Sequence, residues 1–255
     1  MSISAIENFE GDADRFEFPY NPQSFDSSLE SNAQFNNLAY QRHHILVAGK
    51  GGANPNNIPL AGHFSGESRW DDYRKLSGHF GENNRLKKLF FESDKFSLGV
   101  PFGLKRTHSS GRTNFIDYVF QFNTVVSMLF GAEEKTSGVN EGNSDTFVFE
   151  VSGQISDGGS DVVLEDGVGR VITVSSGNFS SGDSFLYKFV EMVDSGSGIK
   201  VSQYGNVYIN GDLVRGVSSS EGFKVLEIKK GESVSSVSVS NLDDFEVKFR
   251  DGYAD

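Results

Sequence analysis

The side chains that could do chemistry are few and are spaced in ways that suit no known constellation. The chain has five histidines and no cysteine. His43 and His44 are adjacent, so on a strand they would point to opposite faces and could not easily share a metal ion. His63 and His79 lack the H-E-x-x-H or H-x-H spacing that brings two imidazoles onto one metal. We therefore expect no metal-ligating residues, and expect these histidines to lie at solvent edges or interfaces.

Patterns for nucleophilic and phosphate chemistry are incomplete. Residues 62–66 read G-H-F-S-G, which places Ser65 one position late for a nucleophile elbow. No Ser or Thr follows Lys50 in the glycine-rich segment 48–52, as a Walker loop requires. Asp157 and Asp161 lie in a Gly/Ser turn without the glutamate that completes an EF-hand loop. We expect no catalytic or cofactor-binding residues, although a carboxylate pair placed for glycoside cleavage is left open.

Charge is distributed unevenly along the 255 residues. The net charge of -12 argues against phosphate neutralisation as a way of holding nucleic acid. Residues 1–131 carry 14 acidic and 13 basic side chains, whereas residues 132–255 carry 21 and 10. This asymmetry predicts two domains, residues 1–133 and 145–255, joined by a Gly/Ser/Asn-rich linker at 134–144. The N-terminus lacks a secretory pattern and no apolar run could span a bilayer, so we expect cytoplasmic synthesis and no membrane partner.

The clearest helix lies between residues 68 and 81. Large side chains recur every three to four positions, and Ser68 is suited to cap its start. Gly78 or Gly81 can end it. We expect the apolar face of this helix to be buried; its members are Trp70, Tyr73, Leu76 and Phe80.

The remaining pattern is that of β-strands. In residues 115–124 one parity is apolar and the other mixed, so the strand should bury one face and offer the other to a partner. Residues 145–255 contain short strands with turn signals every 8–12 residues, typical of an antiparallel sandwich. The fold class predicted is therefore mainly β. The candidate assembly or packing positions are Trp70, Tyr73, Leu76, Phe80, Phe115, Val119, Phe120 and Phe122.

Aromatic composition favours dry packing. The chain has 23 Phe but only eight Tyr and one Trp, whereas sugar-binding surfaces favour Trp and Tyr because these rings have polar tips. We expect phenylalanine to fill cores and subunit interfaces.

Residues 16–131 present a distinctive order of features. An aromatic strand with an Asn-Pro turn, FEFPYNPQSF, is followed by QRHHILVAG and PLAGHFSG. A helix with the spacing W-x-x-Y-x-x-L, a basic strand RLKKLFFES and a closing strand TNFIDYVFQFNTVVSMLFG come next. This order resembles the N-terminal domain of tail-tube-like and distal-tail (baseplate hub) proteins of tailed viruses. The run VLEIKKGESVSSVSVSNLDDFEVKFRDGYAD is similar to the end of distal tail proteins, with Lys230-Gly231-Glu232 where Pro-Gly-Asn is common.

The resemblance implies an N-terminal tail-tube-like β-sandwich or split barrel with one flanking helix, followed by a C-terminal antiparallel β-sandwich. It implies a non-enzymatic virion protein, without cofactor, that forms a hexameric ring at the tail tip. The implied partners are copies of itself, the tail tube protein, the baseplate hub or tape-measure protein, and receptor-binding or fibre proteins. DNA would pass only transiently through the lumen. The alternatives are a tail tube subunit with an added outer domain and a carbohydrate-binding module.

Overall fold

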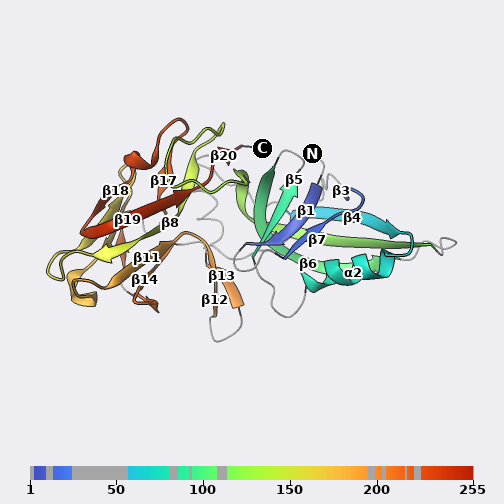
Figure 1. The fold of residues 1–255 in the computed structure, drawn as a ribbon, viewed down its shortest axis with the longest axis horizontal. Helices are drawn as coiled ribbons and strands as arrows, with labels where there is room; N and C mark the ends of the chain where they lie inside the picture. Colours follow the sequence, from blue (N-terminus) through green and yellow to red (C-terminus); the bar gives the residue numbers. More distant parts are fainter. Residues whose placement is uncertain are drawn as a thin grey trace. The chain divides into compact units, whose positions relative to one another are not determined.

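The chain divides into two compact units, Met1–Leu129 and Phe130–Asp255 (Figure 1). The computed structural model describes residues 3–9, 14–24, 57–80, 86–91, 94–107, 114–194, 199–202, 205–215, 217–220 and 225–254. The strand predicted at 41–49, the loop at 48–52 and the histidines at 43 and 44 lie outside these residues. Each unit is described by itself.

In its described residues, the first unit is built on one sheet and helix α2. Its elements are β1 (Ile3–Asn8), β2 (Arg15–Glu17), β3 (Gln23–Ser24), β4 (Asn57–Ser65), α2 (Arg69–Gly78), β5 (Lys87–Phe91), β6 (Lys95–Thr107) and β7 (Phe115–Gly131). The strands are hydrogen-bonded in the order β2-β1-β5-β6-β7-β4-β3, and α2 lies against β4. The last two residues of β7 belong to the second unit.

Aromatic rings bring strands from opposite ends of this order together. Phe16 of β2 meets Phe64 of β4 edge-on, with ring centroids 6.0 Å apart. Phe18 stacks against Tyr118 and Phe120 of β7, each at 6.4 Å. Because β2 and β4 are separated by four strands in the sheet, these contacts require the sheet to curl around its own core. A curled sheet with a flanking helix matches the predicted mainly β fold.

The alternation predicted for residues 115–124 is confirmed. Every second side chain, namely Ile116, Tyr118, Phe120, Phe122 and Thr124, is at most 5% exposed. Their neighbours of the other parity are exposed or half-buried. Phe120 and Phe122 are therefore core residues, and none of the side chains at 115, 117, 119, 121 and 123 on the second face of β7 is fully buried.

Helix α2 begins and ends where the sequence predicts. It follows Ser68 and ends at Gly78, but Ser68 does not cap a backbone amide. Instead, its hydroxyl donates to Asp72 Oδ2 at 2.9 Å. Leu76 is fully buried, and the ring of Phe80, just beyond the helix, meets Phe120 edge-on at 5.1 Å.

The expectation that Trp70 packs into the core is wrong. The side chain is 42% exposed, and the Arg106 guanidinium lies 5.3 Å from its ring centroid. At 3.6 residues per turn, Trp70 lies about 120° around the helix from Leu76, so the two cannot share one buried stripe. Tyr73, about 60° from Leu76, is half-buried.

The second unit is an antiparallel β-sandwich. One sheet has the order β15-β14-β11-β8-β17, with β19 also pairing with β8, and the other has the order β16-β10-β9-β18. A separate ribbon pairs β12 with β13, and β20 follows β19. The bounds are β8 (Thr146–Ile155), β9 (Val162–Glu165), β10 (Val171–Val174), η1 (Ser176–Asn178), β11 (Ser184–Lys188), β12 (Glu191–Asp194), β13 (Ile199–Ser202), β14 (Asn206–Ile209), β15 (Asp212–Leu213), β16 (Ser218–Ser219), β17 (Glu227–Ile228), η2 (Val234–Ser236), β18 (Ser238–Ser240), β19 (Leu242–Phe249) and β20 (Gly252–Tyr253).

The segment expected to be a linker, residues 134–144, is instead an ordered loop of the second unit. The backbone of Lys135 exchanges two hydrogen bonds with Phe249, at 2.8 and 2.9 Å. The Asn140 amide donates to the Glu232 carbonyl at 2.8 Å. A composition rich in Gly, Ser and Asn is compatible with a hydrogen-bonded loop as well as with a solvated linker. The hydrogen bonds to residues that are distant in sequence make this segment an ordered loop.

Candidate assembly surfaces

The open face of the first sheet carries a groove. Its volume is about 290 Å³, and it crosses the open faces of β4 and β7 and the far half of β6. The lining residues are Pro59, Leu60, Ala61, Phe102, Gly103, Lys105, Val119, Phe120 and Gln121. Strand pairing aligns Ala61 with Val119 and Pro59 with Gln121, so side chains of one parity on two neighbouring strands meet on this face. The groove is mostly apolar, with Lys105 as its charged lining residue.

An exposed aromatic cluster lies on the same two strands. Tyr20 stacks on the His63 ring at 5.1 Å, and Phe115 meets His63 edge-on at 5.5 Å. The Ser65 hydroxyl donates to the Tyr20 hydroxyl at 2.9 Å. Tyr20 and Phe115 are both more than a third exposed, so this cluster leaves apolar ring surface in water. Partly buried aromatic side chains with a polar tip are enriched at protein interfaces.

The sequence-predicted candidates separate into two groups. Leu76, Phe80, Phe120 and Phe122 pack within the first unit. Val119 lines the groove and Phe115 belongs to the aromatic cluster, while Trp70 and Tyr73 lie on the helix surface. The structure therefore leaves four of the eight positions available to a partner: Trp70, Tyr73, Phe115 and Val119.

Sequence reasoning missed the other members of the open face. Pro59, Ala61 and Phe102 become neighbours of Val119 only through the pairing of β4, β7 and β6. The parity of residues 59–65 could have placed Ala61 and His63 on one face. Nothing in the sequence indicates that Tyr20 reaches His63.

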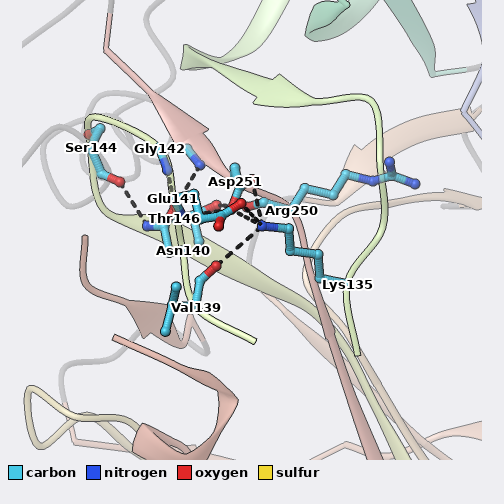
Figure 2. Close-up of polar contacts among 10 residues, drawn as sticks. Lys135, Val139, Asn140, Glu141, Gly142, Ser144, Thr146, Arg250 and Asp251 are labelled. Atoms are coloured by element: carbon cyan, nitrogen blue, oxygen red, sulfur yellow. Dashed lines mark hydrogen bonds and ion pairs between the residues drawn. The ribbon is translucent and has the colours of Figure 1, made fainter. Parts of the chain in front are cut away.

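In the second unit a lysine ties the ordered loop to the C-terminal strands. Figure 2 shows Lys135 Nζ between the Asp251 carboxylate, at 2.8 Å, and the Val139 carbonyl, at 3.3 Å. Glu141 accepts a further hydrogen bond at 3.0 Å. Burial alone would lower the pKa of Lys135, but the hydrogen bonds to Asp251 and Glu141 raise it above its usual value. We interpret this ion pair as structural, because Lys135 and Asp251 both belong to the second unit and pair with each other there.

The side-chain amide of Asn140, in the same loop, has hydrogen-bond partners for both its nitrogen and its oxygen (Figure 2). It is 1% exposed and donates to the carbonyls of Ser144, at 2.8 Å, and Ile228, at 3.4 Å. Its oxygen accepts the backbone amides of Gly142 and Gly252, both at 3.1 Å. Thus one side chain joins the loop to two strands that are far away in sequence.

Asp157 and Asp161, the loop carboxylates considered as cation ligands, accept hydrogen bonds from loop residues. Asp157 accepts the Gly159 amide at 3.0 Å and the Ser160 hydroxyl at 2.7 Å, and these bonds lower its pKa, with Ser160 the larger cause. Asp161 accepts the Ser176 amide at 2.9 Å. Among the described residues no group of three His, Asp or Glu side chains could hold a metal ion. The described part of the chain also has no helix long and apolar enough to span a bilayer.

Comparison with known proteins yields structural relatives only. No protein-family model matches the sequence, and no curated protein has a matching sequence. The chain is similar to a chain of the phage P2 baseplate in its activated conformation with Ca, with a TM-score of 0.55, 11% identity and 98% of each chain covered. A structure of the same baseplate with Sr gives a TM-score of 0.51 at 12% identity, again over 98% of each chain. The SPP1 Dit (gp 19.1) protein aligns at a TM-score of 0.37 and 10% identity, over 79% of this chain and 80% of that one.

The resemblance inferred from the sequence is therefore confirmed at the level of the fold. The alignment with the P2 baseplate chain spans both units of this chain. Its mainly β architecture is similar to that of the aligned phage P2 baseplate chain.

Proposed function

We propose that this chain is a non-enzymatic structural subunit of a phage tail tip. The observation that carries the proposal is the alignment over 98% of both chains with a phage P2 baseplate component. An alignment of this extent includes both units in the same order, which a shared β-sandwich alone would not produce. The proposed location is the virion tail, after synthesis in the host cytoplasm.

The open face of the first sheet supports self-assembly in this role. Its groove and its aromatic cluster expose apolar surface along β4 and β7. Apolar surface gathered on one face is a common mark of an interaction site. The first unit would form a ring, six-membered in the family that the sequence resembles, that connects the tail tube to the baseplate hub.

The two units differ in charge, and in this proposal they face different surroundings. The second carries 21 acidic and 10 basic residues against 14 and 13 in the first. In this proposal the acidic sandwich contacts receptor-binding or fibre proteins. The near-neutral first unit surrounds a lumen through which DNA passes without being held, because holding it would need a clustered basic excess.

Light scattering coupled to size-exclusion chromatography tests the proposal. The full chain should elute as a particle several times its monomer mass of 27.9 kDa. Co-elution with the tail tube or hub protein encoded beside it would support the proposed position. A strictly monomeric protein at high concentration, with no binding to either neighbour, would overturn it.

A further inference from the structure

The second unit displays an aromatic side chain on a bulge in β19. The pairing of β19 with β8 shifts register between Asp243 and Glu246, and Phe245 within the shift is 46% exposed. Asp244 has φ 46, a left-handed conformation that is uncommon outside glycine. Bulges of this kind re-aim side chains.

The opposing strand is built to accept this bulge. Gly153 of β8 lies directly beneath it, and a Cβ at that position would come within 3.1 Å of the Phe245 Cβ. A side chain there would push the bulge away from β8. The exposed ring therefore depends on both a strained residue and a glycine.

Acidic residues flank Phe245 in the sequence. Asp243, Asp244 and Glu246 are all exposed, and Glu246 lies 3.7 Å from Lys248 Nζ, so Phe245 is an apolar knob with acidic neighbours. We call these four residues the acidic knob. Its natural complement is an apolar recess with a basic rim.

The groove of the first unit has these properties. Pro59, Ala61, Phe102 and Val119 provide apolar walls, and Lys105 is the basic residue that lines it. A dry cavity of roughly 150 Å³ holds a benzene molecule, so a groove of about 290 Å³ has room for a phenyl ring. Asp117 lies two positions from Val119 on the same face, so the carboxylates of the knob must approach from the Lys105 side.

We propose that the acidic knob of one copy inserts Phe245 into the groove on the first unit of a second copy. The inference rests on the proposed function, since it supplies the interface that a homo-oligomer needs. The chain itself carries both complementary surfaces, which favours a second copy over another protein. A contact between two different surfaces of the same chain is heterologous, and repetition of such a contact closes a ring when the rotation allows it.

The absence of native cysteine makes a direct test possible. Full-length Ala61→Cys and Gln154→Cys proteins, one carrying a mass tag, are mixed and treated with a short bismaleimide. Gln154 is exposed and pairs with Asp243, so its thiol lies beside the knob and leaves Phe245 in place. Because each chain has one thiol, a mixed dimer can arise only between copies. The control mixes Ala61→Cys with Val168→Cys, whose site on the second unit is also exposed, at 41%. We expect several-fold more mixed dimer with Gln154→Cys than with the control.

Charge exchange and truncation complete the test. Lys105→Glu should lower the yield of mixed dimer, and adding Asp243→Lys to the Gln154→Cys partner should restore it. Phe245→Ala should weaken self-association about 30-fold, as for an interface hot spot. An oligomeric wild type with no more cross-linking than the control would overturn this inference and leave the proposed function standing. A wild type that is monomeric throughout would overturn both.

Discussion

The buried amide of Asn140 offers the sharpest test of how the second unit is built. Replacing it with alanine removes three well-formed side-chain hydrogen bonds, at 2.8, 3.1 and 3.1 Å, and a longer one at 3.4 Å. Each good bond contributes about 1 kcal/mol net, so the loss should be about 3 kcal/mol. Because domains are stable by only about 5–15 kcal/mol, the second unit should melt about 10 °C lower.

Differential scanning calorimetry of the full chain measures this change. The fluorescence of Trp70, the chain's single tryptophan, follows the first unit and should show an unchanged transition. Ser137→Ala is the matched control, because Ser137 lies exposed in the same loop. If Asn140→Ala melts like Ser137→Ala, the side-chain hydrogen bonds of Asn140 contribute nothing to the stability of the second unit, and the stabilising role assigned to them is refuted.

Three further predictions concern the stability of the first unit, and the first two are measured by urea denaturation followed by Trp70 fluorescence. Burial, then the charge of Lys87, lowers the pKa of His79 below 6.5, so the unfolded chain takes up this proton first. The contribution of neutral His79 to the free energy of unfolding should therefore be fully present above pH 6.5. Below that pH the free energy of unfolding should fall by at most about 1.4 kcal/mol per pH unit. His79→Phe should flatten that slope, and an equal slope in the variant would contradict the assignment of the slope to His79. Tyr118→Phe should stabilise the unit by about 1 kcal/mol, because this buried hydroxyl has no hydrogen-bond partner among the described residues; a loss of stability would reveal a missed partner. Trp70→Ala should lower the free energy of unfolding by about 1 kcal/mol or less, whereas Leu76→Ala should lower it by about 2–5 kcal/mol. Thermal unfolding followed by circular dichroism measures both losses, and equal losses would place Trp70 in the core.

Features that depend on local periodicity could be predicted from the sequence. The alternation at 115–124 is a period of two, and burial of Tyr118 and Phe120 follows from it directly. The helix at Arg69–Gly78 follows from three- and four-residue spacing and from a glycine at its end. Both patterns are contained in about ten consecutive residues.

Features that depend on distant partners could not be predicted. Asn140 is buried because it meets Gly252, which lies 112 residues away, whereas its own neighbours resemble a solvated linker. The groove exists because Ala61 is paired with Val119 on neighbouring strands, and the register of that pair cannot be predicted from either segment alone. The exposure of Trp70 is a different case, because its position about 120° around the helix from Leu76 follows from local spacing and could have been predicted.

Negative-stain electron microscopy of the purified full-length protein distinguishes a ring-forming subunit from a monomer. We expect class averages of closed rings of several copies with a central opening. Particles of single-chain size at every concentration and salt condition would contradict this expectation.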